Sequence, residues 1–314
     1  MRSLPPRGLR QLALVLPLLG LTVACGGQAG TVPAAAFGEP VAPMPAAATT
    51  SAAPAPMPKL LPKNPGHPRP RKKQQPAPRK GNVGERLRLA AARAEPGTTI
   101  GAVVYDRTTG RSPVAYNAEH GFRSASLVKL LIAIDVLERG AGAADREQVA
   151  RMLMMSDDGL ASMFWVREGG PAIVTRTGAE LGLTGVAPPE VSGQWGQVVV
   201  TPRDVVAIYR HVLGLPAADR DLIVTALGAA PRVAADGFDQ HFGIPDGLTA
   251  QWAVKQGWGS NDQARVLHST GLVGPHFRYV VVLLTEHPLG TGWPACARSV
   301  TAAASALHGA LPGI

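Results

Sequence analysis

Three short segments of this sequence combine nucleophilic and basic side chains at spacings that could support acyl transfer. Ser126 and Lys129 stand three residues apart, just before the apolar run 130–134, so both are expected on one face of the first turn of a helix. A helix N-terminus offers unpaired N–H groups and positive potential, which favour a developing oxyanion. A lysine held neutral by burial and by nearby cations can accept the serine proton. Ser126 is therefore the candidate nucleophile and Lys129 its candidate base.

The second and third segments add further polar groups. Residues 156–158 read Ser-Asp-Asp at a break between two helical patterns, and residues 255–258 read Lys-Gln-Gly-Trp on a β-rich stretch. Taken singly, each segment also has an ordinary structural explanation. A helix-capping serine with a surface lysine explains 126–129, a helix cap explains 156–158, and a strand end explains 255–258. The three segments indicate chemistry only in combination.

The rest of the sequence must fold into elements that bring these segments together. Residues 82–90 are typical of a capped first helix, and residues 99–105 and 113–117 of a β-hairpin. Helical periodicity then dominates near 126–139, 145–154, 158–167, 171–182, 202–213 and 217–228. Three strands and a closing helix follow at 251–258, 265–270, 278–286 and 295–311. This order predicts an α+β fold, a helix-covered antiparallel sheet built from both ends of the chain.

The charge distribution argues against a nucleic-acid-binding domain. The chain has 314 residues and a formal net charge of +9. Residues 1–80 hold 11 lysines and arginines and one acid, Glu39, whereas residues 81–314 hold 20 basic and 21 acidic residues. Because the excess positive charge lies outside the predicted domain, that domain has no basic surplus for a nucleic-acid-binding face. No nucleic-acid partner is expected.

The N-terminal segment has the features of an export signal followed by a linker. Residues 1–25 combine a basic start, an apolar run too short to span a bilayer, and small residues before Cys25, which resembles the lipobox of bacterial lipoproteins. A core helix with a buried cysteine is the alternative. Residues 28–80 contain 13 prolines without apolar periodicity, so 26–81 is expected to be a disordered basic tether before a domain at 82–314. We expect an exported monomer, anchored through lipid on Cys25 to the outer face of the bacterial cell membrane.

Other chemistries have little support in the sequence. With Cys25 lipidated, Cys296 has no partner, so no internal disulfide is expected. The glycine-rich stretches open no βα unit that could cradle a phosphate. Five histidines of the predicted domain, at positions 211, 241, 268, 276 and 287, also lack metal-ligand spacing. Neither a metal nor another cofactor is expected.

The three segments, in this order, resemble the motifs of the serine penicillin-recognising enzymes, the class A β-lactamases and D,D-peptidases. That family uses Ser-x-x-Lys on a helix, Ser-x-Asn on a loop and Lys-Thr/Ser-Gly on an edge strand. The resemblance covers about 82–311 and includes the hairpin and a Thr-Pro helix start at 201–204. The runs 242–248 and 254–258 are similar to a narrower group, the alanine-rich lipoproteins with a β-lactamase-like fold. The resemblance implies a five-stranded antiparallel sheet covered by helices, plus an all-helical subdomain.

The resemblance also implies a role for each matching residue. Ser126 would be the acyl-accepting nucleophile and Lys129 its general base. Ser156 would pass a proton toward the leaving nitrogen, assisted electrostatically by Lys255. The oxyanion hole would consist of the backbone N–H groups of Ser126 and of Trp258, the residue after the glycine of the third motif.

Further residues would meet the substrate. Asp158, Gln256 and Gly257 occupy the remaining motif positions beside Trp258. Arg265 lies on the next predicted strand, where some class A enzymes place an arginine for the substrate carboxylate. A solvated charge on that strand is the alternative for Arg265.

The sequence departs from the family pattern at three points. Asp158 replaces an amide, and because an ionised carboxylate only accepts hydrogen bonds, it could pair with Lys129 and keep that lysine charged. Gln256 replaces the hydroxyl that usually meets the substrate carboxylate. In the loop where class A enzymes carry the deacylating glutamate, Glu190 is the only carboxylate and is out of register. An acyl-serine should therefore persist, and the short 126–156 segment predicts an open site.

Two functions remain open. The first is a membrane-anchored active-site-serine acyl hydrolase of the β-lactamase/penicillin-binding type, acting on β-lactam or D-Ala-D-Ala-like peptidoglycan amides with slow deacylation. The second is a catalytically attenuated lipoprotein that keeps the fold and acts as a cell-wall-binding or scaffolding module. The intact serine–lysine set favours the first function, and the replacements at Asp158 and Gln256 favour the second.

Overall fold

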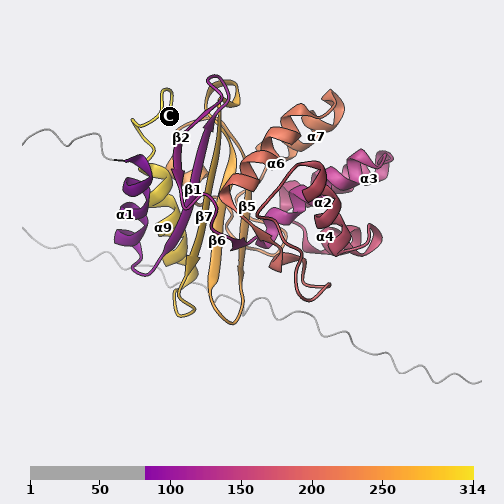
Figure 1. Ribbon diagram of the computed structural model, residues 1–314, viewed down its shortest axis with the longest axis horizontal. Helices are drawn as coiled ribbons and strands as arrows, with labels where there is room; N and C mark the ends of the chain where they lie inside the picture. The colour runs from indigo at the N-terminus through magenta and orange to yellow at the C-terminus, as the bar shows by residue number, and fades with distance from the viewer. Residues whose placement is uncertain (1–81) are drawn as a thin grey trace, which may run out of the picture. The chain divides into compact units, whose positions relative to one another are not determined.

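The middle layer of the domain is an antiparallel sheet (Figure 1). The structure is a computed structural model that describes residues 82–314. Five strands lie in the spatial order β2-β1-β7-β6-β5. They span β1 Thr99–Asp106, β2 Arg111–Tyr116, β5 Trp252–Ser260, β6 Arg265–Val273 and β7 Tyr279–His287. The sheet therefore joins the two ends of the domain sequence, as expected.

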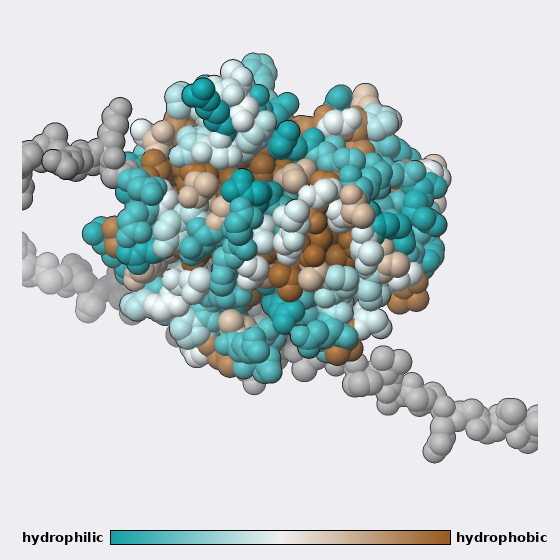
Figure 2. Space-filling view, viewed as in Figure 1, coloured by the Kyte–Doolittle hydropathy of each residue, from teal (hydrophilic) through white to brown (hydrophobic). Residues whose placement is uncertain are grey.

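Helices cover both faces of this sheet. Helices α1 (Val83–Ala94) and α9 (Trp293–Ser305) pack together on one face. The other face carries a helical block: α2 Val128–Glu138, α3 Ala143–Met155, α4 Asp158–Arg167, α5 Pro171–Glu180, α6 Pro202–Gly214 and α7 Ala217–Gly228. Figure 2 shows the side of the molecule that faces the viewer in Figure 1. Its surface is mostly hydrophilic, with hydrophobic residues visible between the sheet and the helical block. The expected α+β fold with an all-helical subdomain is confirmed.

Helix α2 is buried along nearly its whole length. Every residue from Val128 to Leu137 is buried, which explains why its sequence is apolar without an amphipathic pattern. The helix packs against α3, α4, α5 and α6. Because protein interiors are close-packed, these contacts fix the position of its first turn. The residues at that turn are therefore held rigidly.

Side-chain caps define the helix starts that the sequence predicts. The side chain of Asn82 accepts a hydrogen bond from the Gly84 N–H at 3.0 Å at the start of α1. Thr201 and Asp204 form a capping box at the start of α6. The closing helix is shorter than expected, because α9 ends at Ser305 and turns follow it.

Three short elements were not anticipated from the sequence. Strands β3 (Phe122–Arg123) and β4 (Val199–Val200) pair with each other outside the main sheet. Helix α8 (Ile244–Gly247) packs against α9 and β5. Elements of two to four residues are too short for hydrophobic periodicity to reveal. The β3–β4 pair matters for the site because β3 leads directly into the first motif.

The N-terminal predictions fall outside the described residues. The signal at 1–25, the lipid site at Cys25 and the tether at 26–81 all precede the first described residue. Among residues 82–314, the structure contains no helix long and apolar enough to cross a membrane. Cys296 is a buried free cysteine.

Candidate active site

The candidate nucleophile lies at the entry to α2. Ser126 is the middle residue of the 3-10 turn η1 (Ala125–Leu127) and is 5% exposed. Ala125 has a φ of 45°, in the left-handed region that residues with a side chain rarely adopt. Such strain costs free energy and clusters at functional sites. The strained turn therefore supports Ser126 as a functional residue.

Lys129 lies one turn further along and is fully buried. Its Nζ atom donates a hydrogen bond to Ser126 Oγ at 2.8 Å and to the Ser156 backbone oxygen at 2.9 Å. The same Nζ forms an ion pair with Asp158 Oδ1 at 2.5 Å. The distance to Ser126 is within the range for direct proton transfer. Lys129 thus lies where a general base for Ser126 must lie.

Ser156 connects the two lysines of the site. It follows α3 in the left-handed conformation, with a φ of 53°. Its Oγ accepts a hydrogen bond from Lys255 Nζ at 2.9 Å and from Lys129 Nζ at 3.3 Å. The structure therefore brings both lysines and both serines into one hydrogen-bonded chain that ends at Ser126.

Burial lowers the pKa of both lysines. For Lys129, desolvation is the largest effect, and the Asp158 carboxylate opposes it by raising the pKa. For Lys255, desolvation and then repulsion from Lys129 bring the pKa well below its usual range. Two ammonium groups in one buried site disfavour each other. A neutral amine beside Ser126 is therefore accessible, and Asp158 limits how readily Lys129 becomes that amine.

The edge strand β5 passes close to η1. A Cβ added to Gly257 would lie 3.0 Å from the backbone oxygen of Ser124, so glycine permits this approach of two backbones. The next residue along β5 is Trp258. An oxyanion hole built from the N–H groups of Ser126 and Trp258 requires such an approach, and it stays a prediction.

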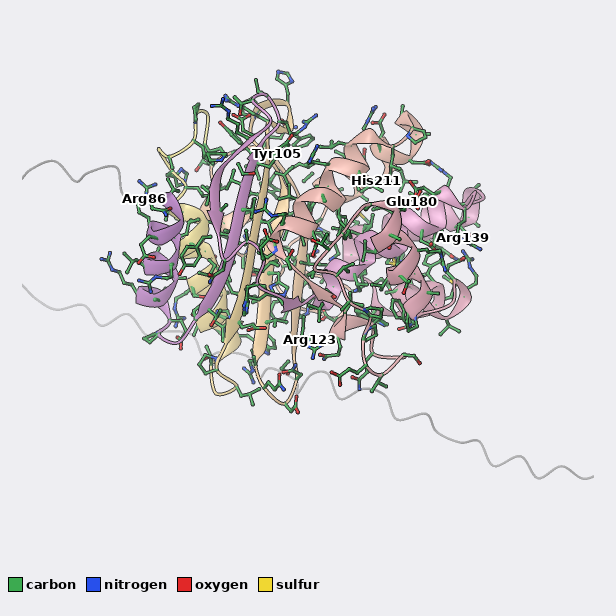
Figure 3. All side chains as sticks on the ribbon, in the orientation of Figure 1. Arg86, Tyr105, Arg123, Arg139, Glu180 and His211 are labelled. Atoms are coloured by element: carbon green, nitrogen blue, oxygen red, sulfur yellow. The ribbon has the colours of Figure 1, made fainter. Side chains whose placement is uncertain are left out.

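His268 ties the sheet to the strand that leads into η1. It lies on β6, directly opposite Gly257 of β5, and is fully buried. Its Nδ1 accepts a hydrogen bond from the Thr285 N–H at 3.1 Å, so the proton is on Nε2, which donates to the Arg123 oxygen at 2.7 Å. Arg123 lies at the opposite end of the sheet from Tyr105 (Figure 3). Although sequence analysis found no function for His268, the structure gives it a positioning role.

Replacing His268 with alanine is expected to slow acylation of Ser126 about tenfold, because an unpaired Arg123 carbonyl costs about 1–3 kcal/mol and loosens the turn. His268→Gln can still donate to that carbonyl and should recover most of the rate. Burial lowers the pKa of His268 to about 4, so the ring is neutral at pH 6 and at pH 8. For each variant, the acylation rate relative to the wild type should therefore be the same at both pH values. Labelling rates with a fluorescent penicillin measure this effect. Equal rates for the alanine and glutamine variants would contradict the positioning role.

Trp195 is another residue of the site that was not predicted from the sequence. The ring centroid of Trp195, in the 3-10 turn η2 (Trp195–Gln197), lies 4.8 Å from Lys129 Nζ. Its Nε1 donates to Ser162 Oγ at 3.1 Å. Glu190, in the same loop, is exposed. This loop therefore brings an aromatic ring, and not its carboxylate, to the lysine. A tryptophan in a loop is too weak a sequence signal to reveal that contact.

Gln256 does not join the hydrogen-bonded chain. Its side chain is buried on the opposite face of β5 from Lys255. Its Nε2 donates to the backbone oxygens of Gln240 at 3.0 Å and Phe242 at 2.7 Å. Gln256 Oε1 has no hydrogen-bond partner among the described residues. The structure gives Gln256 a role in holding the segment before α8, so its predicted contact with substrate has no support here.

Arg265 is likewise engaged away from Ser126. Its Nη1 donates to the Thr291 backbone oxygen at 2.6 Å. Its guanidinium lies 4.9 Å from the ring centroid of Trp293, at the start of α9. The predicted role of Arg265 in binding a substrate carboxylate has no support from these contacts.

The remaining histidines show no arrangement for catalysis or metal binding. Within residues 82–314, no group of three or more His, Cys, Asp or Glu side chains is placed to hold a metal ion. His287 is buried, hydrogen-bonded to Ser299 Oγ at 2.7 Å, and burial lowers its pKa to about 4. His211 pairs with Glu138 on the surface at 2.7 Å. These contacts are structural.

Comparisons with known sequences agree with this geometry. The family model described as "Beta-lactamase enzyme family" matches residues 84–148, which contain the first motif. The protein named "Putative lipoprotein LppW" of Mycobacterium tuberculosis is 36% identical over 221 residues, which cover 66% of this chain and 70% of the relative. The LppW protein of Mycobacterium bovis matches equally.

Solved structures show the same fold. The β-lactamase from Streptomyces albus G superposes with a TM-score of 0.56 at 22% identity, covering 73% of this chain and 99% of that chain. The structure of PBP-A superposes with a TM-score of 0.59 at 19% identity, covering 74% of this chain and 96% of that chain. At these identities the likeness concerns the fold alone.

Proposed function

We propose that the chain is an active-site-serine acyl hydrolase, because it belongs to the β-lactamase enzyme family and to the group of the mycobacterial LppW proteins. Its substrates are β-lactams or D-Ala-D-Ala-like amides of wall peptides. The observation that carries the proposal is the contact of Lys129 Nζ with Ser126 Oγ at 2.8 Å.

Acylation follows the hydrogen-bonded chain. Ser126 Oγ attacks the amide carbonyl, its proton passes to Lys129 Nζ, and the oxyanion is held by the N–H groups of Ser126 and Trp258. The carbonyl–nitrogen bond then breaks. Ser156 donates its proton to the leaving nitrogen and is reprotonated from the lysines, because its Oγ contacts both ammonium groups.

Deacylation is slow in this proposal. Water must attack the acyl-serine, and it needs a base near Ser126. The loop that contains Glu190 contributes the ring of Trp195 near Lys129, while Glu190 itself is exposed. Asp158 is already paired with the lysine. The acyl-enzyme therefore accumulates.

Covalent labelling of the purified full-length protein tests the proposal. A fluorescent penicillin should label the wild type, and Ser126→Ala should abolish the label. Ser124→Ala is the matched control, because Ser124 is also buried in this turn and its Oγ bonds only to a neighbouring backbone oxygen. Equal labelling of Ser126→Ala would assign the nucleophile to another residue.

A second candidate function is a cell-wall-binding or scaffolding module with attenuated chemistry. The ion pair between Asp158 and Lys129 favours it, because a lysine kept charged cannot accept the serine proton. Absence of labelling in the wild type, together with binding of the unreacted protein to isolated cell walls, would support this alternative.

Membrane anchoring also belongs to the proposal. Lipid on Cys25 would hold the domain at the outer face of the cell membrane, and the name of the LppW relatives describes them as lipoproteins. Cys25→Ala should then shift the exported protein from the membrane fraction to the soluble fraction.

A further inference from the structure

The two serines and the oxyanion hole define where the leaving group of a substrate must lie. The scissile carbon contacts Ser126 Oγ, and the leaving atom contacts Ser156 Oγ on the side of Lys255. Substituents on the leaving group therefore extend past Ser156 along the end of β5. The charges in that region decide which leaving groups are accepted.

Asp236 is fixed in that region by two hydrogen bonds. Its Oδ2 accepts from Trp258 Nε1 at 2.9 Å, and its Oδ1 accepts from the Phe238 N–H at 3.0 Å. The preceding residue, Ala235, donates its N–H to the backbone oxygen of Met155 at 2.8 Å, and Met155 directly precedes Ser156. Asp236 therefore lies between the Ser156 turn and the edge of β5.

The ring of Trp258 lies near both Asp236 and Lys255. Its centroid lies 5.9 Å from Lys255 Nζ, and the ring stacks on Phe238 at a centroid distance of 4.8 Å. Lys255 is buried, with 1% of its surface exposed. Asp236 is exposed. A ligand at this end of the site therefore meets the carboxylate before it meets the ammonium group.

The polar groups that could offset this negative charge are engaged elsewhere. Arg265 donates a hydrogen bond to the Thr291 backbone oxygen and lies against the ring of Trp293. Arg232, from the same segment as Asp236, pairs with Asp239 and Asp246. Among the described residues, neither arginine forms an ion pair with Asp236.

We propose that Asp236 makes the site prefer substrates with a cationic leaving group over substrates whose leaving group carries a carboxylate. The inference rests on the proposed acyl-hydrolase function and ranks its substrates by the charge of the leaving group, so that β-lactams and D-Ala-D-Ala-like amides, whose leaving groups carry a carboxylate, react more slowly than substrates with a cationic leaving group. A carboxylate on the leaving group would lie near a fixed like charge, whereas an amine there gains attraction. An exposed carboxylate is partly screened, so the preference should weaken as ionic strength rises.

Three thioesters with one acyl group test the inference. Benzoyl-D-alanyl esters of thiocholine, mercaptoacetamide and mercaptoacetate carry a cationic, a neutral and an anionic leaving group. In each case Ser126 Oγ bonds to the carbonyl carbon as its proton passes to Lys129, the carbonyl–sulfur bond breaks, and the sulfur leaves with a proton from Ser156 as the thiol that is measured in the first turnover. At low salt, we expect wild-type acylation to be about tenfold faster for the thiocholine ester than for the mercaptoacetate ester. The rate for the neutral mercaptoacetamide ester should lie between these two.

Two variants assign the preference to Asp236. Asp236→Asn retains an oxygen for the Trp258 N–H and should bring the ratio of the two charged esters near one. Asp221→Asn, an exposed change of equal charge on α7, should leave the ratio unchanged. Equal or faster acylation by the mercaptoacetate ester in the wild type would overturn the inference while leaving the proposed function intact. No thiol release above the Ser126→Ala background from any ester would overturn the proposed function and the inference with it.

Discussion

Replacing Lys129 with methionine is expected to slow the acylation of Ser126 about a thousandfold. The reason is that general-base catalysis contributes about 10²–10⁴ to such steps, and Lys129 Nζ is the basic group in contact with Ser126 Oγ, at 2.8 Å. Methionine fills a similar volume in the fully buried site. The pseudo-first-order rate of labelling by a fluorescent penicillin measures the effect.

The same substitution should not destabilise the fold severely. Lys129 is buried in an ion pair whose partner, Asp158, is 55% exposed and can be solvated when the lysine is removed. Removing one partner of a buried ion pair is costly mainly because the other charge is left buried and unpaired, and here the remaining charge is exposed to water. A thermal unfolding midpoint near that of the wild type therefore separates lost catalysis from lost folding. Labelling at the wild-type rate in a folded Lys129→Met protein would rule out this lysine as the base.

Asp158→Asn is expected to speed acylation about tenfold or more near neutral pH. Burial lowers the pKa of Lys129, and the Asp158 carboxylate acts against this by stabilising the ammonium group. Asparagine keeps an oxygen for the hydrogen bond but removes the charge, so the pKa of Lys129 falls further. Because acylation needs the neutral amine, its rate rises with pH through the pKa of Lys129. The variant should therefore show this rise at lower pH, and labelling rates across a pH series measure the shift.

Asp157→Asn provides the matched control. Asp157 is the neighbouring carboxylate, it caps α4 by accepting from the Leu160 N–H, and it forms no hydrogen bond with Lys129. Its removal should change the pH profile much less. A pH profile for Asp158→Asn that coincides with that of the wild type would show that this carboxylate does not control the base.

Gln256→Thr should give no comparable gain, although Gln256 occupies the position of the family hydroxyl. Its amide nitrogen holds the oxygens of Gln240 and Phe242. Threonine has no amide nitrogen to donate, so both carbonyl oxygens would stay buried without this hydrogen-bond donor, at a cost of about 1–3 kcal/mol in the free energy of unfolding. Chemical denaturation measures this loss, and an unchanged stability with faster labelling would contradict it.

Much of the fold could be predicted from sequence because its elements are long and strongly patterned. The apolar run after Ser126 predicts a buried helix, and α2 is that helix. The hairpin and the last three strands were placed within a few residues of their observed ends. The two-residue strands β3 and β4 carried no periodic signal, because pairing between distant segments defines them.

The site was predictable where motif spacing alone determines contact. Ser126 and Lys129 meet because they are three residues apart where the 3-10 turn η1 continues into α2. The contacts of His268, Trp195 and Asp236 join segments distant in sequence, so no local pattern marks them.

Strand alternation explains the outcome at Gln256. The side chain of Lys255 faces Ser156, so that of its neighbour faces the opposite side of β5. The family resemblance assigned Gln256 to the substrate, but the side chain is long enough to bond the segment behind the strand.

The intact mass of the purified full-length protein, followed over time with excess benzylpenicillin, tests most directly whether Ser126 forms a long-lived acyl-enzyme. We expect an added mass of one drug molecule that persists over hours and is absent in Ser126→Ala. An adduct that clears within minutes would contradict slow deacylation and direct attention to Glu190. No added mass in the wild type, or the same added mass in Ser126→Ala, would contradict the central claim that Ser126 forms a long-lived acyl-enzyme.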